Sequence, residues 1–116
     1  MYKDWVAVAV DMVPSIKEVR AGTPDVMKGF SSMAAAALQT KVLDTKTKEL
    51  IALAIGVATR CDACVAFHAE AAVKQGATRE EVMETMGIAI YMGAGPSVMY
   101  AAQAVEAFDQ FANKKG

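Results

Sequence analysis

The stretch that decides the fold covers residues 44–68 and reads DTKTKELIALAIGVATRCDACVAFH. Asp44 can act as a helix N-cap, because its carboxylate can accept hydrogen bonds from the free amides of a first turn. The apolar run that follows lacks the strict alternation of a strand. The pattern predicts one helix that ends near Thr59–Arg60 and a second that begins at about Cys61 and stops at Gly76.

The helical period continues on both sides of this stretch. Further helices are predicted over residues 4–20, 23–39, 78–93 and 96–111. Pro14 is expected either to kink the first of these or to start a second piece. Thr78 and Glu81 have the spacing of a capping box, and the tail 112–116 is expected to fray. Since no run alternates as hairpin strands do, the sequence predicts an all-α fold of about six helices.

Length and composition bound how the chain is organised. Its 116 residues predict a single domain, in which a helical segment, residues 1–22, precedes the main unit, residues 23–111. Counted with glycine and without tyrosine, apolar residues make up 68 of 116, about 59% of the chain, above the roughly 45–50% typical of soluble domains. Thr85 to Val105 carries no charge, but Gly93–Pro96 interrupts the run. We therefore expect buried helices in a homo-oligomer rather than a membrane-spanning helix.

The charges and cysteines exclude several classes of function. With 12 basic and 13 acidic residues, the chain has no basic field for nucleic acid. Two cysteines cannot form the multi-bridge scaffold of a small secreted domain, and Met1–Trp5 does not begin a signal peptide. The sequence predicts a cytoplasmic protein without nucleic-acid or membrane partners, whose thiols are reduced or cycle between thiol and disulfide.

Three chemically reactive side chains share one helix face. At 100° per residue, Cys61, Cys64 and His68 fall within an arc of about 60°. The charged residues of this helix fall on the opposite side, where water is expected: Asp62, Glu70 and Lys74. The thiol and imidazole stripe should therefore face the interior or a cleft.

This spacing suits redox chemistry. Cysteines three apart in a first turn can close a disulfide, and the free amides there favour a thiolate. His68 lies four residues beyond Cys64, so its ring could take the thiol proton or hold the thiolate as an ion pair. Glu49 shares a stripe with Gly56, which would let a neighbouring helix approach closely, and a carboxylate there needs a partner.

Other interpretations of these residues stay open. Both cysteines could be small core residues, and His68 a satisfied core group. A zinc site could use Cys61, Cys64 and His68, but structural zinc sites more often carry a second pair of ligands, so we expect no metal and no cofactor. Glu49 could instead pair at the surface with Lys46 or Lys48, both on its own helix.

The pattern Glu49, eleven residues, Cys61-x-x-Cys64, three residues, His68 resembles the signature of the alkylhydroperoxidase D-like family, also called the carboxymuconolactone decarboxylase family. The resemblance covers roughly residues 23–108. It includes Lys48–Ala54, Gly76–Val82 and the later Gly95–Pro96 before a final alanine-rich helix.

The resemblance implies an all-helical domain that forms trimers or hexamers and carries a redox site. It implies that Cys64 attacks a peroxide and becomes a sulfenic acid, which Cys61 resolves to a disulfide. Glu49 and His68 would form a proton relay. The implied reductant is a dithiol such as a dihydrolipoyl protein, and a peroxiredoxin is an implied partner.

Two departures from the peroxidase branch weaken the expected activity. Ala63 stands where the better-known peroxidases carry a histidine, and Asp62 adds a negative charge at the helix start, which disfavours a thiolate. We expect a weak thiol peroxidase or a disulfide reductase. One alternative is a lactone decarboxylase, which works without the cysteine pair and for which only Arg60 and Lys48 offer basic groups nearby. The other is a non-catalytic oligomeric redox or thiol-carrier module.

Overall fold

The computed structural model describes residues 1–114, and these residues contain five helices and no strand. The helices are α1 (Trp5–Gly22), α2 (Pro24–Leu38), α3 (Thr45–Ala58), α4 (Asp62–Lys74) and α5 (Arg79–Ala112). The all-α prediction is confirmed. None of the helices in this part of the chain is both long enough and apolar enough to cross a bilayer. Residues 115 and 116 of the tail that is expected to fray lie outside the described residues.

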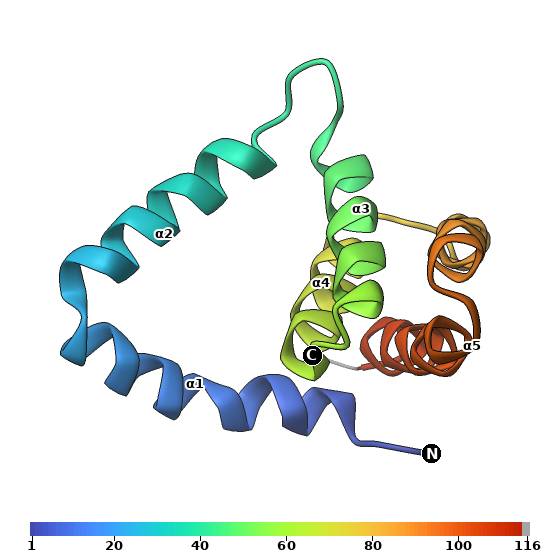
Figure 1. The fold of residues 1–116 in the computed structure, drawn as a ribbon, viewed down its shortest axis with the longest axis horizontal. Helices are drawn as coiled ribbons and strands as arrows, with labels where there is room; N and C mark the ends of the chain where they lie inside the picture. The colour runs from blue at the N-terminus through green and yellow to red at the C-terminus, as the bar shows by residue number, and fades with distance from the viewer. Residues whose placement is uncertain (115–116) are drawn as a thin grey trace.

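The body of the molecule is formed by α3, α4 and the two legs of α5, while α1 and α2 form an arm that leaves the body and returns to it (Figure 1). The core lies between the helices of the body, and its largest fully buried side chains include Leu53, Val57, Val65 and Met86. The start of α1 joins this core through Trp5, which is also fully buried. The arm is therefore fixed to the body at its first residues.

Helices α3 and α5 begin with the side-chain caps that the sequence predicts, and α4 begins with a cap that it does not. The Asp44 carboxylate accepts from the Thr47 amide at 2.8 Å, and Thr78 and Glu81 form both bonds of a capping box. Cys61 is the N-cap of α4. These caps satisfy amides that have no partner within the helix.

The two predicted helix breaks have different outcomes. The expected helices before Gly93 and after Pro96 are both present as the two legs of α5, which meet at the non-helical residue Ala94, with φ 56° and ψ −142°. The predicted corner is present there, and Figure 1 shows the sharp turn between the two legs of α5. In α1 the helix continues through Pro14. Both Pro14 and Val10, whose carbonyl loses its amide donor, are exposed, so water can replace the missing bond.

Helix α2 has no buried residue. Its exposed apolar side chains Val26, Phe30 and Met33 recur at helical spacing and form one face, which we call the α2 apolar face. On the body, a cavity of about 450 Å³ lies between α3 and the first leg of α5. Its lining is almost wholly apolar and includes Leu50, Ile51, Ile55, Ile88 and Met92.

Candidate functional site

The turn between α3 and α4 positions the first cysteine. The Cys61 amide donates to the Gly56 carbonyl at 3.0 Å, and the Arg60 amide donates to the Val57 carbonyl at 3.2 Å. These two bonds form a Schellman motif, which places Arg60 in the left-handed region with φ 56°. The chain thus reverses tightly and delivers Cys61 directly to the start of α4.

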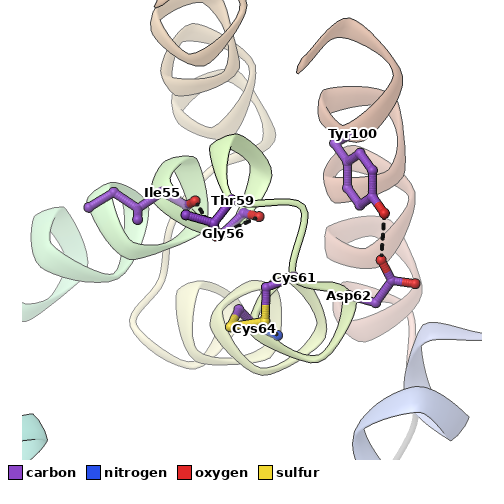
Figure 2. Close-up of a disulfide and its surroundings, with 7 residues drawn as sticks. All are labelled: Ile55, Gly56, Thr59, Cys61, Asp62, Cys64 and Tyr100. Atoms are coloured by element: carbon purple, nitrogen blue, oxygen red, sulfur yellow. Dashed lines mark hydrogen bonds between the residues drawn. A yellow bond between two sulfur atoms is a disulfide. The ribbon is translucent and has the colours of Figure 1, made fainter. Parts of the chain in front are cut away.

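Cys61 and Cys64 form a disulfide, with their Cα atoms 5.2 Å apart (Figure 2). This confirms that the spacing allows the two sulfurs to join. The Cys61 Sγ also accepts a hydrogen bond from the Cys64 amide at 3.2 Å. After reduction, this amide and the positive end of the helix would both stabilise a thiolate at Cys61.

Gly56 allows α3 to lie directly against the cysteine pair. A Cβ atom at this position would be 3.3 Å from the Cys64 Cβ and 3.5 Å from the Val65 amide nitrogen. The close approach expected at Gly56 is therefore present. It brings the buried face of α3, which also carries Glu49, next to the first turns of α4.

Glu49 and His68 form a hydrogen-bonded pair across this contact, with 2.7 Å between Glu49 Oε1 and His68 Nδ1. Glu49 is only 6% exposed, while His68 is half-buried. An ionised carboxylate only accepts hydrogen bonds, so Nδ1 carries the proton in this pair and Nε2 of a neutral ring is left as the acceptor. The pairing also offsets the cost of burying a carboxylate.

The alternative in which Glu49 pairs with a lysine of its own helix is wrong. The Lys46 ammonium instead binds the Glu81 carboxylate at 2.9 Å, and Lys48 donates to the Gln39 carbonyl at 2.6 Å. Both lysines reach away from the buried face, since α3 turns Glu49 toward α4.

The four side chains Glu49, Cys61, Cys64 and His68 thus lie at one junction of α3 and α4. In the disulfide form, no hydrogen bond within residues 1–114 joins the His68 ring to either sulfur. The described residues also contain no group of three or more His, Cys, Asp or Glu side chains that could hold a metal ion.

Asp62 is predicted to face water, and this is only partly correct. Its carboxylate is half-buried, accepts from Lys3 Nζ at 2.6 Å and accepts from the Tyr100 hydroxyl at 2.9 Å. The hydrogen bond from Lys3 is the main reason that the pKa of Asp62 lies below its usual range, while burial opposes this shift. Sequence reasoning missed Lys3 and Tyr100, because both lie far from the motif and neither has a distinctive neighbour.

Comparisons with known proteins agree with this architecture. The model of the carboxymuconolactone decarboxylase family matches residues 24–107. An uncharacterized protein of Cupriavidus necator is 44% identical over 86 residues, which are 74% of this chain and 76% of that protein. An uncharacterized protein of Haemophilus influenzae is 40% identical over 108 residues, which are 93% of this chain and 96% of that protein.

Solved structures lead to the same family. A crystal structure of an apo carboxymuconolactone decarboxylase family protein from Legionella pneumophila matches with a TM-score of 0.91 and 49% identity, covering 94% of this chain and 97% of that one. A Thermotoga maritima family member, described as a candidate for a role in the antioxidative response, matches with a TM-score of 0.74 and 28% identity, covering 86% and 88%. The resemblance seen in the sequence is confirmed, and the chain belongs to the carboxymuconolactone decarboxylase family.

Proposed function

We propose that the protein is a thiol-dependent peroxidase or disulfide reductase that cycles the Cys61–Cys64 pair between dithiol and disulfide. The observation that carries this proposal is a disulfide at the start of α4, with the Glu49–His68 pair on the same helix junction. The antioxidative role suggested for the Thermotoga maritima relative supports the same chemistry.

In the oxidative half of the proposed cycle, the His68 ring takes the thiol proton of Cys64, and the resulting thiolate attacks the terminal oxygen of a hydroperoxide. The O–O bond breaks, Cys64 becomes a sulfenic acid, and the departing alkoxide takes that proton from the protonated His68 ring. The Cys61 sulfur then attacks Cys64, the S–O bond breaks and water leaves. The product is the disulfide found in the structure, and one peroxide has been reduced to an alcohol.

In the reductive half, an external dithiol attacks the Cys64 sulfur and expels Cys61 as a thiolate. The Cys64 amide that bonds the Cys61 Sγ makes Cys61 the better leaving group, since a stabilised thiolate leaves faster. A second attack by the dithiol releases the reduced pair and an oxidised donor. The proposed donor is a dihydrolipoyl protein, and a peroxiredoxin is a further proposed partner.

The test is peroxide consumption with dihydrolipoamide as donor. Cys64→Ser should abolish turnover and His68→Ala should lower it several-fold, because a positioned base contributes strongly to proton transfer. Glu70→Gln, a change on the solvent side of α4, is the matched control and should keep the wild-type rate. Equal rates in the wild type and in Cys64→Ser would remove the enzymatic proposal and leave a thiol-carrier module.

The decarboxylase alternative follows from the name of the family. Within the described residues, the two nearby basic side chains donate to backbone carbonyls: Arg60 to Ala58 at 3.1 Å and Lys48 to Gln39 at 2.6 Å. Lactone turnover by a Cys61→Ser, Cys64→Ser double variant would favour this alternative.

We also propose that the chain forms a homo-oligomer, a trimer or a hexamer. The α2 apolar face and the cavity between α3 and α5 are both open in the single chain. Exposed apolar surface of this kind is typical of subunit interfaces. Light scattering should give several times the monomer mass, and a monodisperse monomer would reject the proposal.

A further inference from the structure

The first residues of the chain are bound tightly to the last leg of α5. The Glu106 carboxylate accepts from the backbone amides of Tyr2 and Lys3 and, at 2.9 Å, from the indole of Trp5. Gln110 accepts from the Trp5 amide at 2.7 Å and donates to the Lys3 carbonyl at 2.7 Å. With Trp5 fully buried, these bonds fix the backbone on both sides of Lys3.

The fixed backbone directs the Lys3 side chain to the cysteine motif. Its Nζ donates to Asp62 Oδ2 at 2.6 Å and to Gln103 Oε1 at 3.0 Å, and it lies 5.3 Å from the centre of the Trp5 ring. The other oxygen of Asp62 accepts from the Tyr100 hydroxyl, as Figure 2 shows. Both carboxylate oxygens of Asp62 are therefore held by groups outside α4.

This arrangement matters because Asp62 lies between the two cysteines, in the first turn of α4. A free carboxylate there opposes the positive helix end and repels a thiolate. An ammonium at 2.6 Å offsets most of that charge, and two fixed oxygens prevent the carboxylate from turning toward the sulfurs. The sequence predicts that Asp62 disfavours a thiolate at the helix start, and this effect is therefore smaller in the folded protein.

We propose that Lys3, assisted by Tyr100, is a positioning residue for the redox pair, which holds and neutralises Asp62 so that a thiolate can form at the start of α4. The N-terminal segment thereby tunes the reactivity of cysteines that lie nearly sixty residues away in the sequence. The inference rests on the redox role proposed for Cys61 and Cys64.

The test measures thiol reactivity rather than peroxidase activity. Fully reduced protein is alkylated with iodoacetamide across a pH series, in the wild type, Lys3→Met, Asp62→Asn and the double variant. In Lys3→Met we expect the midpoint of the more reactive thiol to move upward and its rate at neutral pH to fall at least about three- to fivefold, which is what Coulomb's law gives for like charges roughly 4–6 Å apart even at the dielectric constant of water. In the Asp62→Asn background, Lys3→Met should change the rate little.

Two further variants keep the test independent of folding defects. Lys3→Arg should restore the wild-type profile, and Tyr100→Phe should move the midpoint in the same direction as Lys3→Met but less. A Lys3→Met variant with a lower melting temperature and an unchanged midpoint would overturn the proposal, since Lys3 would then be structural only. Equal effects of Lys3→Met with and without Asp62 would overturn it too.

The outcome is separable from that of the proposed function. If the alkylation profiles shift as expected but no peroxide is consumed, the positioning role of Lys3 stands and the peroxidase proposal fails. If peroxide is consumed but the profiles of the wild type and Lys3→Met coincide, the positioning role fails alone.

Discussion

Replacing Glu49 with glutamine should separate the catalytic contribution of this buried carboxylate from its contribution to stability. Glutamine keeps the shape of the side chain and still accepts a hydrogen bond from His68 Nδ1, so no buried donor loses its partner. The change also removes a charge from a site that is only 6% exposed. We therefore expect the free energy of unfolding to change by less than about 1 kcal/mol, in either direction.

The effect of Glu49→Gln on turnover should be larger. Glu49→Gln removes the negative charge beside the protonated His68 ring. Opposite charges about 4 Å apart attract by about 1 kcal/mol even at the dielectric constant of water, so the protonated ring loses at least about 1 kcal/mol of stabilisation. This corresponds to a loss of at least about fivefold in the rate of peroxide reduction. Glu49→Ala, which also leaves a cavity beside His68, should lose both activity and stability.

The assay for Glu49→Gln is peroxide consumption under saturating dihydrolipoamide, with urea unfolding of the same samples. Glu70→Gln provides the control for removing a carboxylate from the solvent side of α4. A wild-type rate in Glu49→Gln would refute the proton relay. A loss of more than about 3 kcal/mol in unfolding free energy would show that the carboxylate is mainly structural.

Three further predictions concern the turns, the ion pair and the arm. Arg60→Gly should raise the free energy of unfolding and Gly76→Ala should lower it, each by about 1 kcal/mol, because both positions have a positive φ in equivalent Schellman motifs. The melting temperatures of the two variants should move in the same directions. The pKa of Asp62 is lowered on folding, so its ion pair should stabilise the protein at any pH above the usual pKa range of an aspartate. This stabilisation should disappear as the pH falls through the pKa that Asp62 has in the folded protein. Urea titration of Asp62→Asn should show a deficit below about 1 kcal/mol at neutral pH that disappears once the pH is below the folded pKa of Asp62. Phe30→Glu with Met33→Glu, on the α2 apolar face, should lower the mass seen by light scattering, and an unchanged mass would exclude this face from the interface.

The parts of the fold that follow from local chemistry could be predicted from the sequence. The start of α3 depends on the side chain of Asp44, and the end of α4 depends on the conformational freedom of Gly76. Helical periodicity alone predicts that Cys64 and His68 share a face, whereas Cys61 precedes the first helical residue and has an extended backbone. The same short-range rules predict the break near Gly93–Pro96, where the two legs of α5 meet at the non-helical residue Ala94.

The contacts that the sequence did not reveal depend on long-range packing. Lys3 meets Asp62 because the first residues dock on the last leg of α5, and no local pattern encodes that docking. The sequence also did not decide whether Glu49 pairs with a group on another helix or with a lysine of its own helix, since a glutamate near a helix start can bind a neighbouring lysine. Gly56 indicated a close helix contact, but only the fold shows that the neighbour is the helix that carries His68.

The most direct test of the redox account is a single-turnover titration of the reduced protein with peroxide, in which free thiols and remaining peroxide are counted together. The account predicts that each equivalent of peroxide consumed converts one Cys61–Cys64 dithiol to the disulfide, and that Cys61→Ser stops at a sulfenic acid on Cys64. Peroxide that persists while both thiols stay free would contradict it.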